Sequence, residues 1–107
     1  MTPGKTASQA GHAYVESLLS AQQTHPDSFR DYRLNGLGTK VCLAANNLER
    51  LTAAKAQCEA AGIPCALITD SGCANFFDGA PTVTALGVGP AKKHEVKAIT
   101  GRFQLLK

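Results

Sequence analysis

The sequence contains no tryptophan, only two tyrosines and four phenylalanines, and no apolar run of the length that crosses a membrane. The missing run argues against a membrane-spanning helix. No apolar segment follows Lys5, which argues against a secretory signal peptide. With 107 residues, 44% of them hydrophobic and 18% charged, the chain is predicted to form one soluble globular domain over residues 1–107.

The chain also lacks the spacings that metal ligands and disulfide frameworks need. No CxxC pair occurs, and the histidines stand in no ligand-like spacing with one another or with cysteine. A reduced, cytoplasmic protein without a metal is therefore predicted, in which Cys42 and Cys65 pack as small hydrophobic side chains. A Cys–His nucleophile pair stays open, because such partners meet in space and not in sequence. The residues concerned are Cys42, Cys58, Cys65, Cys73, His12, His25 and His94.

Nucleotide-binding and hydrolase motifs are missing as well, since the sequence has no P-loop, HExxH or GxSxG. Gly87-Val88-Gly89 lacks the third glycine of a dinucleotide fingerprint. The formal net charge of +3 is compatible with an anionic partner but does not require one. Near the C-terminus a basic cluster could hold phosphates, or it could be ordinary exposed surface. It consists of Lys92, Lys93, Lys97, Arg102 and Lys107.

Helices and strands are predicted to alternate along the chain. Helices are expected over residues 5–22 and 28–33, from an Asn46 cap to Gly62, and after Pro90. Strands are expected over residues 40–45, 63–68 and 82–88. A strand, a helix and a strand in this order favour a βαβ unit with a parallel strand pair, and hence an α/β fold.

The first helix has two faces that differ in character. The apolar face is predicted to be buried, with small residues that favour close approach to a sheet; it comprises Ala7, Ala10, Gly11, Tyr14, Val15 and Leu18. The opposite stripe carries Lys5, Gln9, His12 and Glu16 at helical spacing. Such a stripe is either a solvated face or one wall of a functional site.

A carboxylate, Asp70, follows the strand at residues 63–68 and begins a connection rich in glycine and hydroxyl residues that ends at Pro81 and Thr82. Acidic side chains at strand ends often build sites in α/β proteins. The alternative interpretation is that Asp70 only caps the turn.

Several motifs together resemble one family. Residues 1–13 resemble the Met-x-x-Gly-Lys-x-Ala-x-Gln-x-x-His-Ala helix of type-II peptidyl-tRNA hydrolases. Residues 40–43 resemble the second strand of that family. The remaining motifs follow in the family's order over the whole chain: Asp70-x-Gly72, Gly79-x-Pro81-Thr82, Gly87-x-Gly89-Pro90, Ile99-Thr100-Gly101 and Leu105-Leu106.

The resemblance implies a three-layer α/β/α sandwich with a small mixed or mostly parallel sheet. It also implies hydrolysis of the ester that joins a peptide, or an N-acylated amino acid, to the terminal ribose of tRNA, without a metal or organic cofactor. Peptidyl-tRNA is the implied partner, without a membrane, and a homodimer is compatible with it. Lys5, Asp70 and Thr82 are the implied catalytic residues. The expected substrate-binding residues are Gln9, His12, Lys92, Lys93 and Arg102.

Two departures from the family pattern favour an alternative, a non-catalytic relative that binds RNA or protein. Cys73 and Ala74 stand where the family has an Arg or a hydrophobic residue and then a Thr that is one of its proposed site residues. The family also carries a strand before the motif that here begins at Met1. An apolar strand encoded upstream of Met1 is therefore expected.

Overall fold

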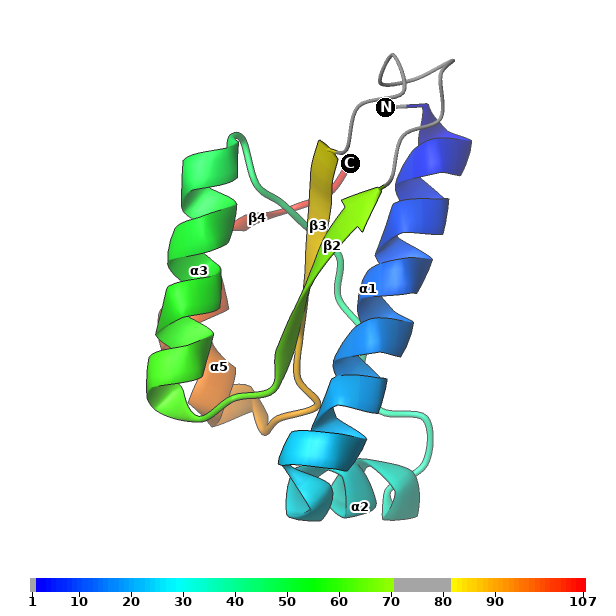
Figure 1. Cartoon of the computed structure of the whole chain (residues 1–107), viewed down its shortest axis with the longest axis vertical. Coiled ribbons are helices and arrows are strands. Elements are labelled where there is room, and N and C mark those ends of the chain that lie inside the picture. The colour runs from blue at the N-terminus through cyan, green and yellow to red at the C-terminus, as the bar shows by residue number, and fades with distance from the viewer. Residues whose placement is uncertain (1, 71–81) are drawn as a thin grey trace.

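The computed structural model of the chain describes residues 2–70 and 82–107, and this part contains four helices and four strands (Figure 1). Residues 71–81, which include Gly72, Cys73, Ala74 and Pro81, lie outside the described residues. The elements follow one another as α1 (Pro3–Thr24), α2 (Pro26–Leu34), β1 (Leu43–Ala44), α3 (Leu48–Ala61), β2 (Cys65–Asp70), β3 (Thr82–Val88), α5 (Lys93–Thr100) and β4 (Gln104–Leu105). The predicted α/β class is confirmed.

Helix α1 begins where local chemistry favours a helix start. The Thr2 side chain accepts a hydrogen bond from the Lys5 backbone N–H over 3.2 Å, and Pro3 occupies the first turn. Proline fits there because the first backbone N–H groups of a helix have no intrahelical acceptor. The helix predicted over residues 5–22 is confirmed and extends two residues further at each end. Pro26 likewise opens α2, which contains the predicted helix at residues 28–33.

The buried face of α1 differs from the predicted one. Its buried residues are Gln9, Ala13, Ser17 and Ala21, whereas Tyr14 and Val15 are exposed. Two polar side chains are tolerated in this interface because both form hydrogen bonds: Gln9 with groups described below, and Ser17 by donating to the Gly89 carbonyl. The prediction failed because it ranked residues by apolarity, whereas small size and satisfied polar groups decide which face approaches the strands.

Strands β2 and β3 form an antiparallel pair that runs from Cys65 opposite Val88 to Asp70 opposite Thr82. The strand predicted at residues 82–88 is confirmed, while β2 begins and ends two residues later than predicted. The register shifts once: Ile68 faces Ala85, but Thr69 faces Val83. Thr84 is therefore the extra residue of a β-bulge in β3.

The parallel strand pair predicted from the βαβ order is wrong for the described strands. β1 pairs with β4, Leu43 facing Leu105, and this pair is antiparallel as well. A βαβ order in sequence does not force its strands to be neighbours, because only about two-thirds of consecutive strands pair or lie adjacent. Here the C-terminal segment is the partner of β1 instead. Of the run predicted as a strand at residues 40–45, only two residues are in β1, and Val41 is exposed.

Helices lie on both sides of the β2–β3 pair, with α1 on one side and α3 and α5 on the other (Figure 1). On the α3 side the buried residues Ala54, Cys58, Ile63 and Ile99 form the core. On the α1 side the approach is so close that a Cβ at Gly87 would lie 2.1 Å from the Ala13 carbonyl oxygen. Glycine at this position allows α1 to rest on the β3 backbone.

Helix α3 is capped by Asn47, whose side chain accepts a hydrogen bond from the Arg50 N–H over 2.9 Å, and not by the predicted Asn46. It ends as predicted at Gly62, whose φ of 71° is left-handed. The helix predicted to open at Pro90 begins only at Lys93.

The cysteines that the structure describes are free thiols, Cys42, Cys58 and Cys65. Cys58 is buried in the core, whereas Cys42 and Cys65, which were predicted to pack as small hydrophobic residues, are half-buried. Burial, reinforced by the neighbouring Cys65, raises the pKa of the Cys58 thiol to about 11.

Candidate active site

A nearly buried ion pair joins the beginning of α1 to the end of β2. The Lys5 Nζ lies 2.5 Å from the Asp70 Oδ2, and the two side chains are only 13% and 16% exposed. Lys5 lies in the first turn of α1, and Asp70 is the last residue of β2. The pair therefore brings together two of the three catalytic residues implied by the resemblance.

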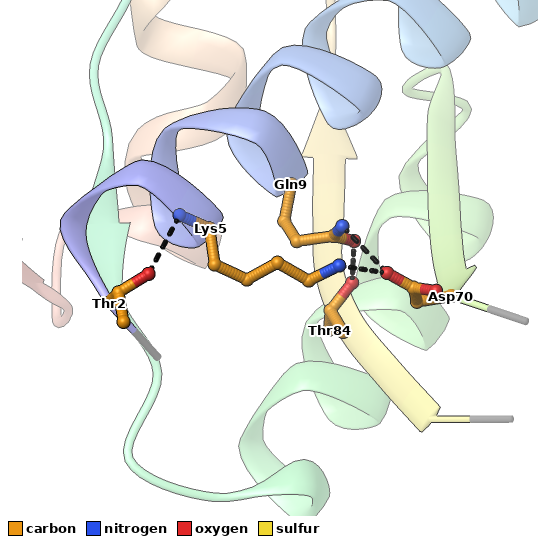
Figure 2. Close-up of polar contacts among 5 residues, drawn as sticks. All are labelled: Thr2, Lys5, Gln9, Asp70 and Thr84. Carbon is orange, nitrogen blue, oxygen red and sulfur yellow. Dashed lines mark hydrogen bonds and ion pairs between the residues drawn. The ribbon is translucent and has the colours of Figure 1, made fainter. Parts of the chain in front are cut away.

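Gln9, one turn along α1 from Lys5, connects this ion pair to β3 (Figure 2). Its Nε2 donates to the same Asp70 Oδ2 over 3.0 Å, and its Oε1 accepts from the Thr84 hydroxyl over 2.5 Å. Gln9 is only 2% exposed. Two donors converging on one carboxylate oxygen stabilise the charged carboxylate of Asp70 and fix its orientation.

Thr84 is a member of this network that the sequence analysis missed. In a regular strand, side chains alternate between faces, so Thr84 would share the face of Leu86 and Val88, which pack with the core on the α3 side. The bulge breaks the alternation and turns Thr84 toward Gln9 on α1. The only sequence signal for the role of Thr84 is the pair of threonines at residues 82 and 84. This pair does not reveal the bulge.

Thr82, the third implied catalytic residue, lies directly opposite Asp70 in the strand register. It is partly buried. Lys5, Gln9, Asp70, Thr82 and Thr84 thus meet where α1 begins and where the β2–β3 pair ends. An amine, a carboxylate, an amide and hydroxyl groups at one place can hold a water molecule and stabilise a negatively charged oxygen.

An open groove of about 860 Å³ starts at this cluster and runs between α1 and β2. Gln9, His12 and Glu16 line it from the helix, and residues 66–70 line it from the strand. His12 is exposed and forms part of the groove wall. The polar stripe predicted on α1 therefore divides into a buried part at Gln9 and a groove-lining part at His12 and Glu16.

The remaining predicted substrate-binding residues lie elsewhere. Lys92 and Lys93 are exposed at the start of α5, near the end of β3 that is opposite to Thr82 (Figure 1). Arg102 donates a hydrogen bond to Gln57 on α3 over 3.0 Å, and its guanidinium lies 5.7 Å from the centre of the Phe103 ring. The structure does not bring these three cations to the Lys5–Asp70 pair.

The described residues show neither a metal-binding cluster nor a helix that could cross a membrane. Residues 2–70 and 82–107 contain no group of three or more His, Cys, Asp or Glu side chains placed to hold a metal ion. Among the helices of the same ranges, none combines the length and the apolar character that a membrane crossing requires.

Fold and site together define an α/β protein with a Lys–Asp pair supported by Gln and Thr at the mouth of a groove. The family model described as peptidyl-tRNA hydrolase PTH2 matches residues 1–106. The chain belongs to this family.

Curated relatives agree with the family model over almost the whole chain. The peptidyl-tRNA hydrolase of Thermococcus onnurineus is 37% identical over 106 residues, which are 99% of this chain and 87% of the relative. The peptidyl-tRNA hydrolase of Methanothermobacter thermautotrophicus is 36% identical and 89% covered. The peptidyl-tRNA hydrolase of Methanocaldococcus jannaschii is 32% identical, and the alignment covers 90% of that relative. The alignments with the Methanothermobacter and Methanocaldococcus proteins each span 99% of this chain.

Proposed function

We propose that this protein hydrolyses the ester bond of peptidyl-tRNA, or of an N-acylated aminoacyl-tRNA, and releases the peptide and the tRNA. Membership in the peptidyl-tRNA hydrolase family supports the activity. The observation that carries the site assignment is the nearly buried Lys5–Asp70 pair at the mouth of the groove.

In this proposal Lys5 stabilises the oxyanion. Water adds to the ester carbonyl carbon, and the carbonyl oxygen acquires negative charge in the tetrahedral intermediate. A cationic amine that is already oriented by Asp70, which Gln9 in turn holds in place, can donate to this oxygen without reorganisation of the site. The short contact with Asp70 keeps the ammonium group in place before the substrate arrives.

Asp70 is proposed to orient the attacking water and to accept its proton, with Thr82 as a hydrogen-bonding partner of that water. When the intermediate collapses, the bond between the carbonyl carbon and the ribose oxygen breaks, and the ribose oxygen takes the proton that Asp70 had accepted from the water and becomes a hydroxyl. The carboxylic acid formed in this step releases its proton to solvent. The peptide leaves with a carboxylate. Gln9 and Thr84 hold Asp70 in position throughout and have no direct role in the bond changes.

Single-turnover and steady-state hydrolysis of N-acetylaminoacyl-tRNA test the assignment. Lys5→Ala and Asp70→Asn should each lower kcat/KM by about two orders of magnitude, as expected for a lost charged partner of the transition state. The loss in the double variant should be smaller than the product of the two single losses if the pair acts as a unit. Because removal of one partner of a buried pair destabilises a protein, thermal denaturation must show that each variant is folded.

The same measurement separates the enzyme from a binding protein. If the parent chain does not hydrolyse the ester, the proposed function is wrong. If Lys5→Ala and Asp70→Asn are folded and as active as the parent, the protein is a hydrolase whose site lies elsewhere, and Asp70 is the turn cap of the alternative interpretation.

Four further features belong to this proposal. Lys92, Lys93 and Arg102 are proposed to contact tRNA phosphates at a distance from the ester. The α/β/α three-layer sandwich implied by the family is supported by the helices on both sides of the β2–β3 pair. A homodimer and a cytoplasmic location stay predictions, which sedimentation and cell fractionation would test.

A further inference from the structure

The groove beside the active site has the features of a binding site for an extended chain. Five consecutive residues of β2, residues 66–70, line it. Successive side chains of a strand point to opposite faces, so a surface lined by consecutive residues is the edge of the strand, where backbone groups are presented.

This edge of β2 has no strand partner within the described ranges. Every residue of β2 is matched to β3 on the other edge, from Cys65 to Asp70, with the one register shift at the bulge. The opposite wall of the groove is α1, where polar residues such as His12, Glu16 and Gln23 face the open space. An extended peptide inserted here could pair with the β2 backbone and lie against a polar helix face.

We propose that the groove binds the peptide part of peptidyl-tRNA as an additional strand along β2. This inference rests on the proposed function. The groove ends at Gln9 and Asp70, so a peptide bound in it would place its esterified C-terminus at the Lys5–Asp70 pair. At about 3.3 Å per residue, five residues of strand edge accommodate about four to five peptide residues.

Recognition by backbone hydrogen bonds fits the chemistry of this substrate. The peptides attached to tRNA share a backbone but no side-chain sequence, and strand addition obtains affinity from the backbone. A polar and open helix wall accepts varied side chains without selecting one. The groove therefore supplies affinity that depends on peptide length and not on peptide sequence.

The experiment compares tRNA esters of N-acetylated alanine peptides of one, three and five residues. KM should fall by about tenfold or more from one to five residues, the value of one or two net backbone hydrogen bonds, while kcat changes little. Methylation of alternate backbone nitrogens in the five-residue peptide should raise KM back toward that of the one-residue ester.

A groove-filling substitution provides the matched test on the protein. Ser20 lines the far part of the groove, so Ser20→Trp should raise KM for the five-residue ester by about tenfold and leave the one-residue ester unchanged. Val15→Trp places the same side chain at an exposed position of α1 that does not line the groove, and it should affect neither ester. Thermal denaturation verifies that both variants are folded.

The outcomes are distinguishable. Equal KM values for all three esters, or a length dependence that is insensitive to N-methylation, would overturn the groove proposal while hydrolysis of the one-residue ester still supports the proposed function. If none of the esters is hydrolysed, the proposed function fails and the groove proposal falls with it.

Discussion

The Thr84 hydroxyl donates to the Oε1 of Gln9 over 2.5 Å and thereby determines which end of the Gln9 amide faces Asp70. The reverse orientation would place the amide oxygen 3.0 Å from a carboxylate oxygen, and two acceptors at that distance repel one another. A β-bulge in β3 is what brings the hydroxyl to this position.

Thr84→Val is therefore expected to lower both stability and activity. It removes the donor from a buried amide oxygen, which costs about 1–3 kcal/mol of unfolding free energy, and it frees the amide that orients Asp70. Thr84→Ser keeps the hydroxyl and should retain most of kcat. Urea denaturation and ester hydrolysis measure the two effects. Equal kcat in the Val and Ser variants would show that Thr84 contributes only to stability.

Gly87→Ala is expected to displace α1. The new Cβ would lie 2.1 Å from the Ala13 carbonyl oxygen, so helix and strand must separate, at a cost of about 1–3 kcal/mol or more. Because α1 carries Lys5 and Gln9, activity should fall as well. Gly11→Ala is the control, since its Cβ would meet nothing within 4 Å and alanine favours a helix. Calorimetry should show a lower Tm for the first variant and an equal or higher Tm for the second.

The raised pKa of the Cys58 thiol predicts that the protein loses stability at alkaline pH. Its pKa is about 11 in the folded protein, compared with 9.0 as its ordinary value. Between pH 9 and pH 11 the unfolded chain releases the Cys58 proton and the folded chain retains it. The free energy of unfolding therefore falls as pH rises from about 9 to about 11, and this group accounts for about 2 kcal/mol of the fall. Below pH 9 this contribution is fully present. Chemical denaturation of Cys58→Ala across this range should show a correspondingly shallower decline; an identical slope would contradict the assignment.

The lysines at the start of α5 predict a salt effect on tRNA binding. If Lys92 and Lys93 contact phosphates, Lys92→Glu and Lys93→Glu together should weaken binding and reduce the slope of log K against log salt by about one to two. Reversal of Arg30 and Arg33 on α2 is the charge-matched control. An unchanged slope in the α5 variant would move the tRNA surface away from α5.

Local signals in the sequence predicted most of the helices. Side-chain periodicity and capping residues depend on neighbouring residues alone, so α1, α2 and α3 were found with errors of one or two residues. Strand pairing was not predictable in this way, because the partner of β1 lies about 60 residues away along the chain. The hydrophobicity of a strand also does not show whether its partner runs parallel or antiparallel to it.

The candidate site was predictable to the extent that motifs carried it. Lys5, Asp70 and Thr82 came from the family resemblance, and the structure brings the first two into contact and sets Thr82 opposite Asp70. The burial of Gln9 ran against its polarity, and the role of Thr84 depends on a bulge that alternation in the sequence cannot reveal.

The separation of Lys5 and Asp70 by 65 positions in the sequence has a consequence for folding. Closing so long a loop carries an entropic cost that the local turns of α1 do not bear, so helical structure can form well before the site does. During refolding, circular dichroism should recover first, and hydrolysis should return only when the chain's distant segments have met. Activity in this small protein thus reports on the meeting of segments that lie far apart in its sequence.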